Sequence, residues 1–150
     1  MAKGVLGSIM GLLALACVAL AAGCGSSDSE ETLTKAEFVK QAGAICEKSQ
    51  EERGKAVAAV AENANPKGNV QKQQEQVIRK ALPTYEEAAR QIEELGAPEG
   101  QEEKVEALVE AMDEAAERAM ADPHTAMTSN IFFREADKLA EEYKLSGCII

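Results

Sequence analysis

Apolar residues recur at three- and four-residue spacing in four segments of the chain, and this period constrains the fold more than any other feature. Such spacing places side chains on one face of an α-helix. The segments run over 38–64, 70–95, 105–120 and 131–143. Four amphipathic helices with short connections pack most simply as an antiparallel up-down bundle, so we predict an all-α four-helix fold over residues 34–150.

Two places in the sequence carry specific signals for a helix start. Thr34 and Glu37 have the spacing of a capping box, in which each side chain binds a backbone N–H at the position of the other. Asp122 followed by Pro123 supplies an N-cap and a first-turn proline, so we expect a new helix there. The polar stretch after Pro123 leaves a start near Ser129 as the alternative.

Three residues interrupt the apolar stripes. Arg53 and Gly54 fall inside the first segment, where glycine weakens or bends a helix. Pro83 falls inside the second segment, and its missing N–H predicts a kink or a short break. The apolar register continues across Pro83, which favours a kink. Pro66 and Gly68 mark the turn between the first two helices.

The expected core is rich in small aliphatic side chains. Aromatic residues make up 3% of the chain and Trp is missing from it, which argues against a β-sandwich or barrel. The stripes assign to the core, among others, Phe38, Val57, Val60, Val70, Tyr85, Leu108, Met112, Ile131, Phe132 and Tyr143.

The charge balance excludes several classes of partner. The chain has 16 Lys and Arg against 26 Asp and Glu, a net charge of −10. A surface of this sign repels phosphate backbones, so we expect no nucleic-acid partner. It also repels anionic headgroups, so attachment to a membrane has to be hydrophobic or covalent. The single His makes His-rich zinc, haem and di-iron sites improbable, and we expect neither a metal site nor a cofactor.

The first residues have the layout of a bacterial secretory signal. Lys3 precedes the uncharged run 5–22, and a polar stretch follows Cys24. The ending Ala-Ala-Gly-Cys resembles the lipobox of bacterial lipoproteins, although that family favours Leu where Ala21 stands here. The resemblance implies that residues 1–23 are a signal peptide removed just before Cys24, whose thiol carries a diacylglycerol. An uncleaved single-pass helix is the alternative.

The resemblance also implies a location. A lipidated Cys24 makes the membrane a partner and places the protein at the cell membrane, on its extracytoplasmic face. Residues 24–33 then comprise the lipidated Cys24 and an acidic, flexible tether, and the nine tether residues 25–33 span about 16 Å.

Two of the four cysteines are then left to pair with each other. Cys17 leaves with the signal peptide and Cys24 takes the lipid, so Cys46 and Cys148 remain in an oxidising setting. We predict a disulfide between them, worth at most about 4.7 kcal/mol in the chain-entropy model for a loop of roughly 100 residues. Two free, buried thiols are the alternative.

The helical part resembles a group of small, uncharacterised lipoproteins of high-GC actinobacteria. The features that carry this resemblance are Phe38-Val39 and Ala42-x-Ala44-Ile45-Cys46 near the start, and Ala136-Asp137-x-Leu139-Ala140-x-x-Tyr143-x-Leu145-x-x-Cys148 at the end. The resemblance implies an exported helical domain with one bridge, and it implies no activity.

Few residues offer catalytic chemistry, and we expect the protein not to be an enzyme. His124 is the only histidine, and it follows Asp-Pro at a helix entrance, where an exposed polar residue is expected. The Met120, His124 and Met127 spacing would suit Cu(I) on one continuous helix, but Asp122-Pro123 interrupts that helix. Adjacent glutamates such as Glu86/Glu87, Glu93/Glu94, Glu102/Glu103 and Glu141/Glu142 are typical of solvated helix faces.

The function expected from these features is binding. We predict a membrane-anchored, exported lipoprotein that acts as a non-catalytic interaction module of the cell envelope, with an unknown envelope protein or apolar ligand as its partner. The alternative is a carrier of a small apolar ligand or metal ion in the bundle core. A filled core with an exposed apolar stripe would favour the module, and a long apolar cavity at Pro83 would favour the carrier.

Overall fold

The structure of the chain is a computed structural model that describes residues 32–150. The signal peptide predicted for residues 1–23 and the lipid site predicted at Cys24 lie outside the described residues, as does most of the predicted tether. Residues 32–150 form helices and connections without strands, which confirms the all-α prediction for this part of the chain.

Three long helices are followed by shorter ones. The long helices are α1 (Lys35–Glu62), α2 (Val70–Glu94) and α3 (Glu102–Ala121). The short ones are α4 (Pro123–Thr128), α5 (Arg134–Glu142) and the single 3₁₀ turn η1 (Ser146–Cys148). Within residues 32–150, none of these helices combines the length and the hydropathy that crossing a bilayer requires.

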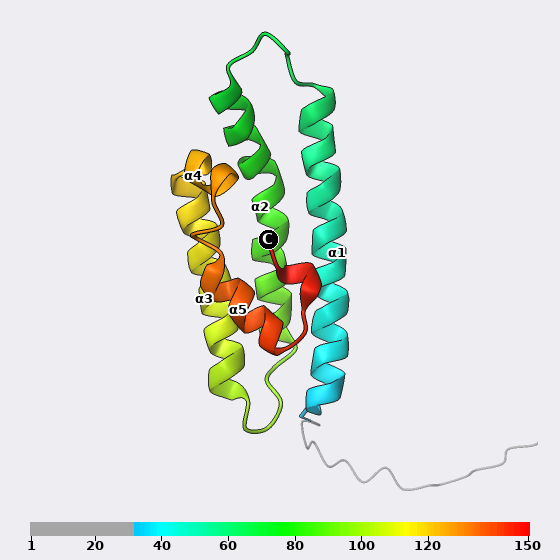
Figure 1. Cartoon of the computed structure of the whole chain (residues 1–150). Coiled ribbons are helices and arrows are strands. Elements are labelled where there is room, and N and C mark those ends of the chain that lie inside the picture. Colours follow the sequence, from blue (N-terminus) through cyan, green and yellow to red (C-terminus); the bar gives the residue numbers. More distant parts are fainter. Residues whose placement is uncertain (1–31) are drawn as a thin grey trace, which may run out of the picture. The chain divides into compact units, whose positions relative to one another are not determined.

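The long helices lie side by side, with α2 between α1 and α3 (Figure 1). The chain passes from α1 to α2 at one end and from α2 to α3 at the other end. The C-terminal segment crosses one side of this layer, where α5 contacts α3 and η1 contacts α1. The main core lies between the layer and this segment.

Aromatic side chains join the two halves of the core. The rings of Phe38 and Tyr143 meet edge to face with centroids 5.5 Å apart. Tyr85 and Phe133 meet in the same way at 5.8 Å. Each of these pairs connects a long helix to the C-terminal segment, and such contacts add to the free energy gained from apolar burial.

The helix-start signals correspond to observed caps. The capping box is complete, because Thr34 Oγ1 accepts from Glu37 N and the Glu37 carboxylate accepts from Thr34 N. Asp122 Oδ1 accepts from Thr125 N at 3.0 Å and caps α4. Helix α2 continues through Pro83, which excludes the short break; the kink that the apolar register favoured stays a prediction. Helix α1 likewise continues through Gly54.

The fourth stripe does not form one helix. Helix α4 ends at Thr128, and α5 begins only at Arg134. Because the residues between them leave the helical period, the stripe is only partly right about the core: Ile131 is 52% exposed, Phe132 is partly buried against the core, and Phe133, which the stripe left out, is buried.

The first two stripes extend further than the core does. The last buried residue of α1 is Ser49, and the first of α2 is Ile78. Val57 and Val70, both assigned to the core from sequence, are 41% and 66% exposed. This correction has a simple cause: η1 packs on α1 near Cys46, so the C-terminal segment leaves the distal part of α1 uncovered.

Candidate functional site

Cys46 and Cys148, the two cysteines predicted to pair, form a disulfide. Cys46 in α1 and Cys148 in η1 are 102 positions apart, and their Cα atoms lie 4.8 Å from each other. Both side chains are fully buried. The bridge ties the end of the chain to the first helix, and its oxidised sulfur atoms offer neither a nucleophile nor a thiolate ligand.

Close backbone packing surrounds the disulfide. A Cβ atom added to Gly147 would lie 2.6 Å from the carbonyl carbon of Cys46 and 2.6 Å from the amide nitrogen of Glu47. The turn η1 therefore approaches α1 as closely as two backbones allow, and only glycine fits at position 147.

Arg53, read from sequence only as an interruption, turns inward at this level of α1. Its guanidinium lies 5.5 Å from the centre of the Tyr85 ring, in the range of a cation–π contact. Burial lowers the pKa of Arg53, yet the group keeps its charge at physiological pH. Burial raises the pKa of the Tyr85 phenol, so that ring stays neutral. The signal for this role was the position of Arg53 in the sequence, because it falls in register with the residues on the buried face of α1.

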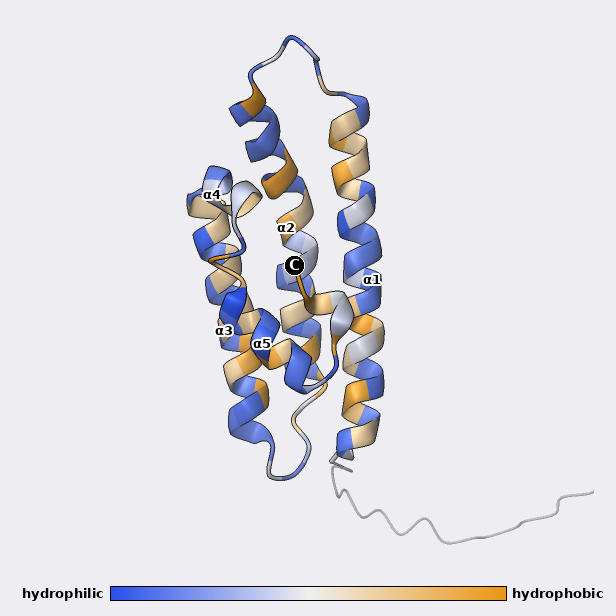
Figure 2. Cartoon of the chain, viewed as in Figure 1, coloured by the Kyte–Doolittle hydropathy of each residue, from blue (hydrophilic) through white to orange (hydrophobic). Residues whose placement is uncertain are grey.

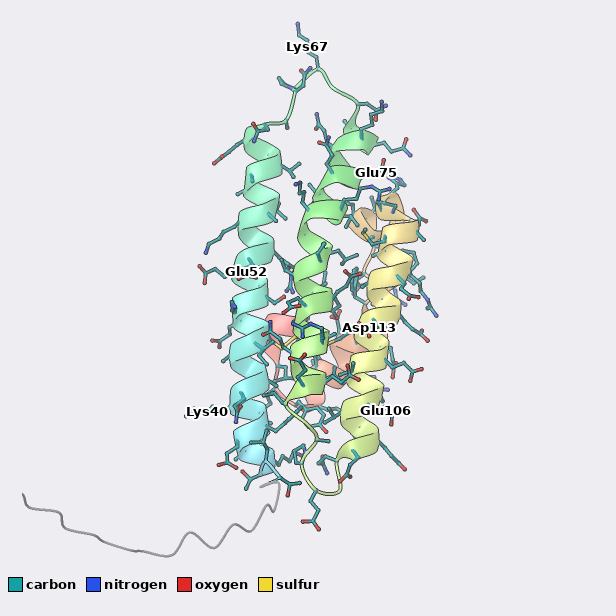
Figure 3. All side chains as sticks on the ribbon, turned by 180° about the vertical axis from the view of Figure 1, so that it is seen from behind. Lys40, Glu52, Lys67, Glu75, Glu106 and Asp113 are labelled. Atoms are coloured by element: carbon teal, nitrogen blue, oxygen red, sulfur yellow. A yellow bond between two sulfur atoms is a disulfide. The ribbon has the colours of Figure 1, made fainter. Side chains whose placement is uncertain are left out.

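A groove runs between the end of α2 and α3, with a volume of about 560 Å³. Ala97, Val105 and Val109 supply its apolar lining. Carboxylates form most of the rest, from Glu93, Glu102, Glu106, Glu110, Asp113, Glu114 and Glu117. Figure 3, which views the helices from behind, shows Glu106 and Asp113 along α3 beside α2.

The groove lies in the most acidic part of the described chain. Residues 93–117 include ten Asp and Glu and one basic residue, Lys104. Partial burial raises the pKa of Asp113, and the nearby charges of Glu93 and Glu117 raise it further. Burial is the larger cause of this pKa shift, and the charges of Glu93 and Glu117 add a negative potential at this position that favours cationic groups.

The sequence contained a signal for this groove that the glutamate pairs did not reveal. Acidic residues recur along α3 at 102, 106, 110, 113 and 117, which places them on one helix face. Of the adjacent pairs considered, Glu93 and Glu102 line the groove, and their neighbours in sequence do not. The spacing, rather than the adjacency, was the informative feature.

The possible copper ligands do not come together on one helix. Helix α3 ends one residue after Met120, and α4 begins at Pro123, so the face that Met120, His124 and Met127 would share is interrupted. His124 is exposed, and its Nδ1 lies 3.2 Å from Gln74 Oε1. Over residues 32–150, His, Cys, Asp and Glu form no group of three placed to hold a metal ion.

Comparison with known proteins identifies no relative: the chain matches no family model, no curated protein and no solved structure.

Proposed function

We propose that this protein is a lipid-anchored, extracytoplasmic interaction module of the cell envelope. Removal of residues 1–23 and lipidation of Cys24 would attach it to the membrane. The described part supports this through the position of its first residues: Leu33 and Thr34 line a shallow pocket with Pro98 and Gln101, at the end of the helices opposite the 63–69 turn. A tether entering there leaves the long sides of the helices accessible.

We further propose that the domain is an up-down bundle in which α4 and α5 together take the place of a fourth helix. The contacts of α4 with α2 and α3, and of α5 with α3, support this description. The two short helices leave the far side of the α1–α2–α3 layer uncovered, which keeps the acidic groove open to solvent.

The proposed binding surface is the acidic groove, and its occupant is a basic amphipathic helix of a partner protein. The observation that carries this is the combination of an apolar floor, from Val105 and Val109, with a carboxylate rim. A helix that carries apolar residues on one face and Lys or Arg at its edges would meet both features at once. Charge complementarity of this kind raises the association rate and selects the partner.

A carrier role in the core is less well supported than this module. Leu82 and Tyr85 on either side of Pro83 are buried. The groove between α1 and α2, next to the helical turn that contains Pro83, is lined mainly by polar side chains, among them Lys48, Glu52 and Gln91. The module is proposed to be non-catalytic, and His124 lies against an amide group rather than a carboxylate.

Substitution of Cys24 tests the anchor. Cys24→Ser in the full chain should abolish palmitate labelling and shift the protein from the membrane to the soluble fraction or to an unprocessed precursor. Cys17→Ser is the matched control, because that residue would leave with the signal peptide. Unchanged labelling and fractionation of the Cys24 variant would contradict the anchor.

A titration with a defined peptide tests the groove. A synthetic Lys/Leu amphipathic helix should bind the full chain, and Glu106→Gln with Glu110→Gln should weaken binding about tenfold because two rim charges are lost. Glu47→Gln with Glu52→Gln removes the same charge from α1 and should change the Kd much less. Equal losses in the two variants would show that only net charge matters and would overturn the groove proposal.

A further inference from the structure

A second groove lies between the distal half of α1 and the first half of α2, with a volume of about 410 Å³. Its two walls come from one helix each, and we call it the distal groove. The α1 wall is apolar apart from one amide, and the α2 wall is polar; the lining residues are Ala56, Ala59, Val60 and Asn63 of α1 with Gln76 and Lys80 of α2. Spacings of three, four and seven positions place each wall on a single helix face.

The described chain leaves the distal groove open to solvent. None of its lining residues is buried, and Ala59 and Lys80 are exposed. Ala59 lies about 140° around the axis of α1 from Cys46, whose side faces η1, so the C-terminal segment does not reach it. Seen from behind, the distal parts of α1 and α2 have no other segment in front of them (Figure 3). Figure 2 shows that hydrophobic bands continue along α1 beyond the C-terminal segment.

The α2 wall of the distal groove is positively charged. Lys72, Gln76 and Lys80 recur every four residues and form one row on α2. Both lysines are exposed, and neither forms an ion pair within the described part of the chain. Residues 63–80 hold four basic residues and one acidic residue, although the whole chain has 26 acidic against 16 basic residues. That acidic residue, Glu75, already pairs with Arg79 at 2.8 Å, so this wall attracts carboxylates from outside.

The α1 wall carries no such excess of positive charge. Lys55 pairs with Glu51 of the same helix at 2.6 Å. Glu52 precedes Ala56 by one turn, Glu62 ends the helix, and both carboxylates are exposed. The carboxylates of an occupant would be attracted along α2 and repelled along α1. The distal groove therefore distinguishes the two edges of an elongated occupant.

We propose that the distal groove binds an amphipathic helix of a partner protein that carries Asp or Glu along one edge. Small side chains at Ala56 and Ala59 let the axis of a third helix approach that of α1 to about 8 Å, the short end of the usual range. The apolar face of the partner helix would cover this wall, and its acidic edge would lie along Lys72 and Lys80. Physiological salt screens charges beyond about 8 Å, so these lysines outweigh the net charge of the chain. The proposal depends neither on the anchor nor on the acidic groove.

A titration with a defined peptide tests the charges. A labelled synthetic helix with Leu and Ala on one face and Glu along one edge should bind the full chain in a non-ionic detergent, as measured by fluorescence anisotropy. Lys72→Gln with Lys80→Gln should raise the Kd about tenfold, because two attractive contacts are lost. Lys40→Gln with Lys104→Gln removes the same charge at exposed positions elsewhere and should change the Kd much less. Glu52→Gln should leave the Kd unchanged or lower it.

Two neighbouring alanines test the apolar wall. Ala59→Gln places a long side chain in the distal groove and should raise the Kd about tenfold. Ala58→Gln is the matched control, because position 58 does not line the groove and should leave the Kd unchanged. Both positions are exposed in the free chain and glutamine favours helices, so the circular dichroism melts of both variants should match that of the parent.

Several outcomes would overturn the proposal. One is that the peptide does not bind at about 100 µM, a weak-affinity limit. Others are equal losses in the two double lysine variants, or an effect of Ala58→Gln equal to that of Ala59→Gln. A glutamate peptide without an apolar face that binds equally well would show that the groove is not used. Binding of phosphatidylglycerol vesicles through Lys72 and Lys80, without binding of the peptide, would make the occupant a lipid surface instead of a helix.

Discussion

Arg53 donates a hydrogen bond from Nη2 to the carbonyl oxygen of Gly147, 94 positions further along the chain, at 2.9 Å. Its Nη1 donates to Ser49 Oγ at 3.0 Å, and Ser49 Oγ in turn donates to the Thr84 carbonyl at 2.8 Å. One side chain of α1 thus connects α2 and the C-terminal turn at the level of the disulfide. The connection fixes η1 against α1 by polar contacts as well as by the covalent bond.

Removing the guanidinium should destabilise the domain. Arg53→Met keeps most of the apolar stem but leaves the Gly147 carbonyl without its charged donor, so we expect a loss of about 2 kcal/mol in the free energy of unfolding. Arg79→Met is the control, because Arg79 only forms an exposed pair with Glu75 and should change stability by less than about 0.5 kcal/mol. Urea denaturation followed by circular dichroism measures both, and equal losses would contradict the role of Arg53.

Two glycines of this region should respond to alanine with opposite signs. In Gly147→Ala the new methyl group would strike the backbone of Cys46, and we expect a loss of about 2–3 kcal/mol. In Gly54→Ala the added Cβ meets no atom within 4 Å in the middle of α1, and we expect a gain of about 0.5–1 kcal/mol. Thermal unfolding distinguishes the two, and a neutral Gly147→Ala would show that η1 can move away from α1.

Loss of the disulfide should lower stability substantially. The double substitution Cys46→Ala with Cys148→Ala opens a loop of roughly 100 residues, so the free energy of unfolding should fall by about 4 kcal/mol. Treatment of the parent with a reductant should shift its urea midpoint in the same direction and leave the double variant unchanged. Mass spectrometry of the non-reduced chain should detect the peptide pair that contains both cysteines, and two alkylatable thiols at these positions would contradict the bridge.

Lys144 occupies a backbone conformation that favours glycine. Its φ is 59°, and it is the C′ residue of a Schellman motif in which Leu145 N donates to Ala140 O and Lys144 N to Glu141 O. Lys144→Gly removes the steric cost of this conformation, so we expect about 1 kcal/mol of added stability. Lys138→Gly, inside α5, should have the opposite effect, and a calorimetric melt of each variant measures the difference.

The acidic groove should make stability depend on pH. Burial and the charges of Glu93 and Glu117 raise the pKa of Asp113 in the folded state above the value of about 3.9 in the unfolded chain. Between these two pKa values the folded state binds more protons, so the contribution of Asp113 to stability falls as the pH rises through this window. Asp113→Asn should therefore be more stable than the parent at neutral pH, and the difference should vanish in acid.

Asp122 should contribute to the pH dependence of stability with the opposite sign to Asp113. Hydrogen bonds from Thr125 lower the pKa of Asp122, so its contribution is present above the unfolded pKa and is lost as the pH falls through the folded pKa. In Asp122→Asn the free energy of unfolding should therefore fall less than in the parent as the pH is lowered. Urea denaturation at a series of pH values checks both variants. If the free energy of unfolding of Asp113→Asn depends on pH as that of the parent does, the negative potential inferred for the groove is contradicted.

Local signals in the sequence predicted the helix ends well. The hydrogen bonds that cap α1 and α4 lie within three residues along the chain, so Thr34, Glu37 and Asp122 carry nearly all the information needed. The apolar period likewise located the long helices, because a strong stripe stabilises a helix wherever it packs. The fourth stripe was wrong about Ile131 and missed Phe133, because both residues lie in the segment between α4 and α5, where the helical period does not apply.

The amino-acid sequence alone determined that this part of the chain is helical, where three long helices lie, that it is strongly acidic, and which two cysteines were left to pair. Only the tertiary structure decided how far along α1 the core extends, that Arg53 turns inward to Gly147, and that the carboxylates of α3 border a groove with α2. The reason is physical: caps and periodicity are set by neighbours in sequence, whereas burial depends on which distant segment comes to cover a face.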